Sequence, residues 1–136
     1  MTRRSPPVPP RPELQRRPEG AFGWLPAGLL HDRWLAEVGP YAIAVLALLA
    51  LAADRRGASF FSRDRMAQAL GMTRHEVDLG LQRLLDAALV DHRPWRPGGR
   101  DGVWQLLPPP PRQQAARAHR ALSAADVLRS LGFPSA

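Results

Sequence analysis

The sequence predicts a mainly α-helical protein with a small β-hairpin, and three observations lead to this prediction. Apolar residues recur at helical spacing in two neighbouring stretches between Phe60 and Leu107. A short turn that contains Gly71 separates these stretches. Two strand-like stretches then flank a turn rich in Gly and Arg, from Arg96 to Gly102. The expected order is short strand, helix, turn, helix, strand, turn and strand.

The two expected helices of this run are defined by their apolar faces. The first helix carries its apolar residues on one side, at Met66, Ala67 and Leu70. The second follows an i, i+4, i+7, i+8, i+11 pattern through Val77, Leu81, Leu84, Leu85 and Ala88. Ser62 and Thr73 suit the N-caps of the two helices, and Gly71 supplies the left-handed backbone that a sharp helix exit needs.

These residues form a known pattern. It consists of Ser62, the segment Met66 to Arg74, the spacing of Val77, Leu81 and Leu84, and Ala88 to Val90 leading into a hairpin. In this pattern the chain resembles the winged helix-turn-helix domains of bacterial and mobile-element regulators and of plasmid replication proteins. The resemblance covers roughly half the chain, from about Tyr41 to Leu107. It implies a DNA-reading second helix and a hairpin wing, although a fold alone does not define a task.

A strongly apolar stretch, Tyr41 to Ala53, precedes this run. It is shorter than the roughly 20 residues that a membrane span needs, and no short basic leader precedes it. We therefore expect a buried core helix in a cytoplasmic protein with no membrane partner. Pro40 suits its first turn. Because none of its faces is polar, we expect the helix to be covered on all sides.

Other parts of the chain must help to cover this helix. The candidates are the preceding segment Trp24 to Val38, the C-terminal segment Gln113 to Leu131, and a second copy of the chain. In the preceding segment one helical face would hold Leu30, Trp34, Leu35 and Val38. In the C-terminal segment, Ser123 to Asp126 fits a capping box that opens a short helix. The sequence leaves intramolecular packing and a homodimer open, and helix-turn-helix proteins usually bind DNA as symmetric pairs.

Composition divides the chain into three parts. Residues 1–21 form a basic, Pro-rich arm without apolar periodicity, which we expect to be disordered. Residues 22–107 form the winged helix-turn-helix domain that the resemblance implies. Residues 108–136 comprise a polyproline spacer and a C-terminal helical segment.

The net charge favours a polyanionic partner. It is +7, and all 19 basic residues are Arg. A GC-rich genome also favours Arg over Lys, so the argument rests on the charge and not on the choice of Arg. Double-stranded DNA is the expected partner.

Metal and catalytic sites are not expected. The chain has no Cys, which excludes disulfides and Cys-ligated zinc. Its four His residues lack the i, i+4 spacing that places two imidazoles on one metal: His31, His75, His92 and His119. Ser62, His75 and Asp78 could be combined into a triad, but a helix cap and two surface positions explain them better. We expect no enzyme activity, no cofactor and no small-molecule ligand.

The outward residues of the second helix are the candidates for reading DNA. If Val77, Leu81 and Leu84 face inward, the outward positions are Arg74, His75, Asp78, Leu79, Gln82, Arg83 and Asp86. Gln82 suits adenine and Arg74 suits guanine, while Thr73 suits a phosphate at the helix N-terminus. Arg63 and Arg65 add positive charge at the start of the first helix.

Three positions depart from the family pattern. Glu76, Asp78 and Leu79 stand where the family more often has Ser, Thr, Arg or Lys. Arg74 and Arg83 against Glu76, Asp78 and Asp86 leave the second helix with a net charge of −1, which would repel phosphates. We therefore expect the hairpin arginines to supply much of the contact: Arg93, Arg96 and Arg100, between Trp95 and Trp104.

Two functional hypotheses follow from the sequence. In the first, the chain binds DNA as a small transcriptional regulator or as a replication accessory factor of a plasmid or mobile element, with the wing and the basic arm supplying affinity. In the second, the winged helix is a protein-interaction module on which Asp78 and Leu79 dock a partner. Binding to duplex DNA separates the two hypotheses.

Overall fold

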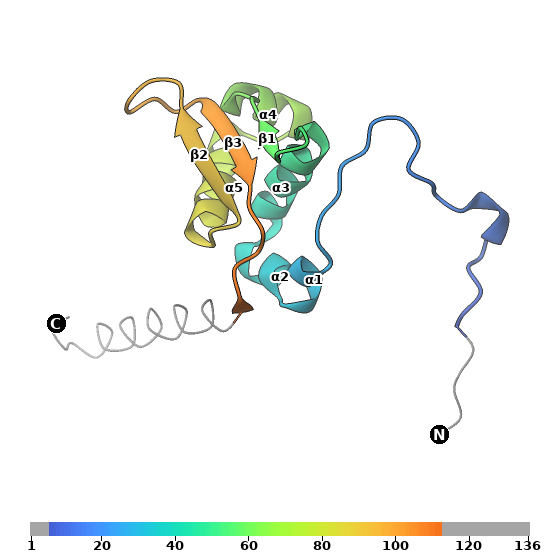
Figure 1. Cartoon of the computed structure of the whole chain (residues 1–136). Helices are drawn as coiled ribbons and strands as arrows, with labels where there is room; N and C mark the ends of the chain where they lie inside the picture. The colour runs from blue at the N-terminus through green and yellow to red at the C-terminus, as the bar shows by residue number, and fades with distance from the viewer. Residues whose placement is uncertain (1–5, 113–136) are drawn as a thin grey trace, which may run out of the picture.

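In a computed structural model the described residues, 6–112, form a helix-rich fold with a small sheet (Figure 1). The helices are α1 (Gly28–His31), α2 (Trp34–Val38), α3 (Pro40–Ala52), α4 (Arg63–Leu70) and α5 (Arg74–Asp86). The strands are β1 (Ala58–Ser59), β2 (Val90–Pro94) and β3 (Gly102–Leu106), which form an antiparallel sheet in the order β1-β3-β2. The expected combination of helices with a small β element is confirmed.

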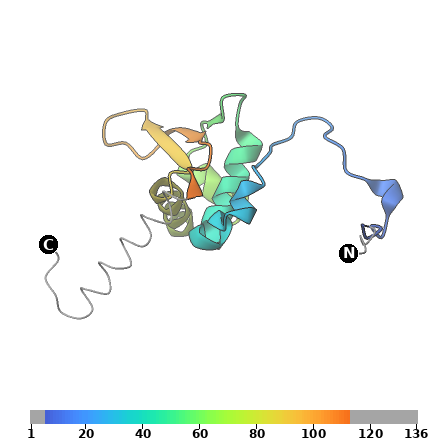
Figure 2. The same ribbon diagram turned by 60° about the horizontal axis from the view of Figure 1, so that its bottom comes forward.

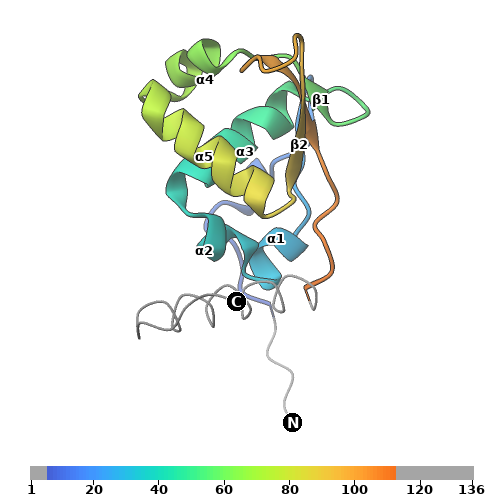
Figure 3. The same ribbon diagram turned by 90° about the vertical axis from the view of Figure 1, so that its left-hand side faces the viewer.

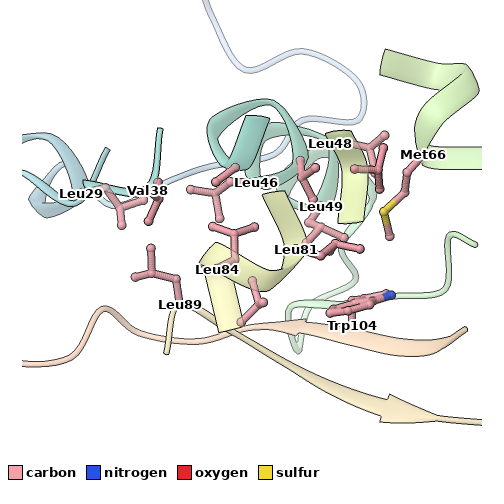
Figure 4. Packing of buried hydrophobic residues seen from close by; sticks show 14 of the residues in the cluster. Leu29, Val38, Leu46, Leu48, Leu49, Met66, Leu81, Leu84, Leu89 and Trp104 are labelled. Atoms are coloured by element: carbon pink, nitrogen blue, oxygen red, sulfur yellow. The ribbon is translucent and has the colours of Figure 1, made fainter. Parts of the chain in front are cut away.

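The apolar stretch forms the central helix α3, as expected, with Pro40 in its first turn. It contacts α2, α4, α5, β1 and β3. Figure 4 shows Leu46 and Leu49 of this helix packed among side chains from the surrounding elements. Residues 6–112 do not by themselves cover all sides of this helix, because Tyr41, Ile43 and Leu51 are exposed; the C-terminal segment and a second copy, the other two expected covers, lie outside the described residues. The buried face of α3 is formed by other residues of the same helix.

The segment before α3 differs from its expected form. It is two short helices and not one, because Arg33 between them adopts a left-handed backbone with φ 65°. The break changes which side chain faces the core: Leu29 is buried and Leu30 is exposed, so the prediction for Leu30 is wrong. Trp34 and Val38 are buried as expected, and Leu35 packs against the core. This segment therefore covers part of α3.

The helix pair α4–α5 follows its sequence signals. The Ser62 hydroxyl accepts a hydrogen bond from the Arg65 amide. At the other end of α4, Gly71 is the C-cap and has a left-handed backbone with φ 63°. Val77, Leu81 and Leu84 are fully buried, as predicted. Ala88 does not extend this face, because α5 ends at Asp86 and Ala88 is exposed in the left-handed region with φ 56°.

The sheet lies against the helices on one side only. Figure 3 shows α3, α4 and α5 together on one side of the strands, and Trp104 of β3 is buried on that side (Figure 4). His92 of β2 stacks on Trp104 with 3.9 Å between ring centroids. The first strand lies at Ala58–Ser59, just before the expected start at Phe60, whose side chain is exposed.

The chain before α1 is exposed. Residues 6–21 have no buried position, and only Pro12–Leu14 forms a short 3-10 turn. Figure 2 shows this segment leading away from the helices. At the other end, Arg112 stacks on Trp34 at 4.8 Å and forms an ion pair with Glu37. The helix expected within Gln113 to Leu131 lies outside the described residues. Between residues 6 and 112 no helix has the length and apolarity that crossing a bilayer requires.

Candidate nucleic-acid interface

Arg63 joins the start of α4 to the β2–β3 hairpin and to α5. Its amide donates to Asp101 Oδ1 at 3.1 Å, and its Nε donates to the Arg100 carbonyl at 3.2 Å. Its Nη1 donates to Asp78 Oδ1 at 2.7 Å, while the guanidinium lies 5.4 Å from the Trp104 ring centre. Only 17% of this side chain is exposed. Arg63, predicted to contact DNA, is thus committed to holding three elements together.

Asp78 faces Arg63 and not open solvent. Burial raises the pKa of this carboxyl, but the hydrogen bond and charge of Arg63, with the charges of Arg74 and Arg100, outweigh burial and hold the pKa below its ordinary value. The carboxylate is therefore ionised and compensated at neutral pH. Asp78, expected at an outward position of α5, is 30% exposed and paired with Arg63.

Glu76 is also used inside the structure. Its Oε1 accepts from the Thr73 amide at 2.9 Å, and its own amide donates to Thr73 Oγ1 at 3.1 Å, which completes a capping box at the start of α5. The Thr73 amide and a hydrogen bond from the Tyr41 hydroxyl hold the pKa of Glu76 below its ordinary value. The Glu76 carboxylate therefore has structural partners that offset its charge, and Thr73 serves as a helix cap.

These contacts change the charge that α5 offers to a ligand. The exposed stripe of α5 consists of His75, Leu79, Gln82, Arg83 and Asp86. The charges of Arg83 and Asp86 cancel, so these two residues leave the stripe without net charge. The count of −1 for the whole helix also includes Arg74, Glu76 and Asp78, and the structure shows that these three charges have partners within the fold.

Three other residues predicted on the two helices, Gln82, Arg74 and Arg65, have partners as well. Gln82 Nε2 donates to Asp86 Oδ1 at 2.9 Å, one helical turn along. Arg74 is half-buried and pairs with Asp64, and its Nε lies 3.7 Å from Asp78 Oδ1. Arg65 is exposed and stacks over Phe61 at 4.9 Å. Of this group, Arg65 and Gln82 can reach a ligand without losing an ion pair.

The hairpin arginines are free. Arg93, Arg96 and Arg100 are all exposed, and none forms an ion pair with another residue in the range 6–112. The loop that carries them is closed by hydrogen bonds from the Trp95 amide to the Asp101 carbonyl at 3.0 Å and from the Gly99 amide to the Arg96 carbonyl at 2.8 Å. Gly98 supplies the positive φ of 76° that this turn needs. Within the described residues, the closed hairpin thus holds three exposed arginines that form no ion pair.

An exposed aromatic pair lies beside these arginines. Phe60 and Trp95 stack with 6.1 Å between ring centroids and 15° between ring planes. Trp95 was identified from the sequence as a residue flanking the turn, but Phe60 was missed as a site residue because it was assigned to a strand. A signal was present: Phe60 is followed by Phe61, and only one of two adjacent residues can face the core of a strand.

Two hollows border the sheet. One, of about 440 Å³, is lined by Arg56, Phe60, Arg93, Val103 and Gln105, together with Ala58, Asp91 and His92. The other, of about 780 Å³, is more apolar and lies between the segment Phe22 to Pro26, the end of α3 and the segment Gln105 to Pro109. Within the described residues, no three His, Asp or Glu side chains gather in a way that would hold a metal ion.

Searches against protein-family models, curated proteins and solved structures find no match to this chain.

Proposed function

We propose that the chain is a winged helix-turn-helix protein that binds double-stranded DNA, acting as a small transcriptional regulator or as a replication accessory factor. In this proposal α4, the turn at Gly71 and α5 form the helix-turn-helix, and the β2–β3 hairpin is the wing. The capped helices, the left-handed turn and the hairpin that follows α5 all support it.

The observation that carries the proposal is the set of free hairpin guanidinium groups. Arg93, Arg96 and Arg100 have no carboxylate partner within residues 6–112, whereas Arg63 and Arg74 are paired. Free guanidinium groups on a closed loop favour a phosphate backbone, because each can exchange a condensed counterion for a direct contact. Arg63 donates hydrogen bonds both to the Arg100 carbonyl of the hairpin and to Asp78 in the second turn of α5, so these two parts of the surface are neighbours.

The stripe on α5 supplies the surface that reads bases in this proposal. It carries no net charge, so it does not repel phosphates, and it offers His75, Gln82 and Arg83 to base edges. Leu79 suits contact with a thymine methyl group. Arg63 supports this arrangement indirectly, because it fixes the hairpin against α4 and α5.

Fluorescence anisotropy with a random-sequence duplex at low salt tests the proposal. The wild-type chain is expected to bind, and Arg96→Gln/Arg100→Gln is expected to bind at least about tenfold more weakly, since each loses a phosphate contact. Arg33→Gln/Arg55→Gln is the matched control: it removes two exposed charges outside the hairpin. No detectable duplex binding, or equal losses in the two double variants, would contradict the proposal.

Replacement of Gln82 tests base reading separately. Gln82→Ala is expected to weaken binding to a selected target site more than to random duplex, because a base contact is lost only at the target. Asp86→Ala is the control for the intrahelical bond: it frees Gln82 Nε2 and leaves the amide in place. An equal loss on both DNAs would show that Gln82 does not read bases.

The alternative, a protein-interaction module without DNA binding, retains one observation. Leu79 stays exposed at 41% on α5, whereas Asp78 is taken up by Arg63. Absence of duplex binding in the anisotropy experiment would favour this alternative.

A further inference from the structure

The outer surface of the sheet is distinct from the helical side. Side chains alternate along a strand, so Trp104 faces the helices while Val103 and Gln105 face away from them. On the neighbouring strand β2, Asp91 and Arg93 share this outer surface. Figure 3 shows α3, α4 and α5 all on the opposite side. Because these helices do not cover the outer surface, a ligand can bind there.

The aromatic pair Phe60–Trp95 lies beside this surface and is not buried by the fold. Phe60 is 55% exposed and Trp95 is 62% exposed, although their near-parallel rings stack on each other. Two large apolar rings kept in water favour a ligand that covers them. A planar aromatic ligand fits best, because it can continue the stack that the two rings begin.

The surroundings of the pair favour a negatively charged ligand. The hollow of about 440 Å³ next to Phe60 is lined by Arg56, Arg93, Val103 and Gln105, with Asp91 as a carboxylate at its edge. That volume lies in the range of about 300–1,000 Å³ typical of small-ligand pockets. Arg56 pairs with Asp54, but Arg93 has no ion-pair partner among residues 6–112. Arg96 and Arg100 add further positive charge along the same hairpin.

We propose that this aromatic surface, defined as Phe60, Trp95, Arg93 and Gln105, binds unpaired bases of single-stranded DNA. Bases in a duplex expose only their edges in the grooves, so they cannot stack on Phe60 or Trp95. An unpaired base offers its ring face, and its phosphate can contact a free arginine. Gln105 supplies an amide for the base edge. The preferred substrate is thus a duplex that carries a single-stranded segment.

This inference rests on the proposed DNA binding and specifies which DNA is bound. In it, the wing does more than grip a duplex: its aromatic surface holds a strand that has left the duplex. In this inference a blunt duplex contacts only the helix-turn-helix and the hairpin arginines. A tailed or bubble-containing duplex fills the aromatic surface as well, and should bind more tightly.

Three DNAs of matched sequence test the inference: a blunt duplex, the same duplex with a single-stranded tail, and the single strand alone. The wild-type chain is expected to prefer the tailed duplex over the blunt one. Trp95→Leu is expected to weaken tailed-duplex binding by about 5- to 150-fold, the effect of losing one stacked base, and to leave blunt-duplex binding unchanged. Phe60→Leu should act in the same direction, and Trp95→Phe should restore most of the loss because it keeps a ring face.

Trp24→Leu is the control, because Trp24 is also an exposed tryptophan, at 74% against 62% for Trp95, and lies outside both the hairpin and the hollow next to Phe60. It should leave both affinities unchanged. A 2-aminopurine base in the tail gives a second readout, since stacking on Trp95 quenches its fluorescence in the wild-type chain but not in Trp95→Leu.

The outcomes separate this inference from the proposed function. Equal affinity for blunt and tailed duplex, or the same loss in Trp95→Leu and Trp24→Leu, would overturn the inference and leave duplex binding intact. No binding to any of the three DNAs would overturn both. Binding to the single strand without binding to the blunt duplex would support the aromatic surface and contradict the proposed duplex function.

Discussion

At the scale of single residues, two non-glycine residues between positions 6 and 112 occupy the left-handed backbone region. Arg33 separates α1 from α2, and Ala88 follows the end of α5. Two backbone hydrogen bonds close the end of the helix: the Ala88 amide donates to the Leu85 carbonyl and the Leu89 amide donates to the Leu84 carbonyl, both at 3.0 Å. Glycine is the usual residue at such a helix exit, because a Cβ is strained there.

Ala88→Gly is therefore expected to stabilise the protein. Relief of the left-handed strain outweighs the added flexibility of the unfolded chain, with a net gain of about 0.5 to 1 kcal/mol in the free energy of unfolding. Ala69→Gly, at an exposed position inside α4, is the control and should destabilise by a similar amount. Urea denaturation measures both. A loss of stability in Ala88→Gly would show that the alanine backbone is not strained.

His92 makes stability depend on pH. Its ring stacks on buried Trp104, and its Nε2 is buried with no hydrogen-bond partner in the described chain. Burial lowers the pKa of His92 below the ordinary value, the charge of Arg63 lowers it further, and Asp101 and Asp91 oppose the shift. The folded protein thus favours the neutral imidazole.

The free energy of unfolding should fall as the solution is acidified below neutral pH. Above about pH 6.5 both folded and unfolded chains hold neutral His92, and stability is complete. As pH falls, the unfolded chain gains the proton first, so stability is lost down to the lower folded pKa. Thermal melts of wild type and His92→Phe between pH 7 and pH 5 measure this. Equal pH dependence in the two chains would show that His92 is not the cause.

Sequence reasoning at this scale was accurate where a local signal decides the outcome. The caps at Ser62 and Thr73 and the turn at Gly71 follow from side-chain and backbone chemistry within a few residues. Leu30 was misassigned because the left-handed Arg33 has no signal of its own. Because arginine rarely adopts a left-handed backbone, the periodicity of the apolar residues predicted one continuous helix across Arg33.

At the scale of elements, ion pairs between helices determine which charges are free. Two contacts between helices could not be predicted from the sequence. Asp78 of α5 faces Arg63 of α4, and Glu76 of α5 faces Tyr41 of α3. Spacing within one helix shows which residues point outward, but not what stands opposite them. The helix counted as acidic is for this reason neutral along its exposed stripe.

Arg63→Gln tests whether this residue holds the hairpin to the helices. Loss of its charged hydrogen bond to the half-buried Asp78 should lower the free energy of unfolding by about 2 kcal/mol. Arg56→Gln is the control: Arg56 is 80% exposed and pairs with Asp54, away from Asp78, so the loss should be below about 1 kcal/mol. Equal losses in chemical denaturation would show that Arg63 has no special structural role.

At the scale of the whole molecule, the distribution of charge matters more than its sum. The net charge of +7 indicates a polyanionic partner but not where it binds. Within residues 6–112 the structure separates Arg63 and Arg74, which form ion pairs, from the three hairpin arginines, which form none. The sequence suggested the hairpin as the main contact, since the second helix counted as acidic and the hairpin carries Arg93, Arg96 and Arg100. The placement of Phe60 against Trp95 depends on tertiary packing and was not predictable.

The most direct test of DNA binding through the hairpin is the salt dependence of duplex affinity. The slope of log K against log salt reports the number of phosphates neutralised, at about 0.9 per phosphate. We expect Arg96→Gln/Arg100→Gln to reduce the slope by about 1.8, corresponding to two lost contacts. Arg33→Gln/Arg55→Gln should keep the wild-type slope. An unchanged slope in the hairpin variant, or an equal reduction in both variants, would contradict a phosphate-binding hairpin.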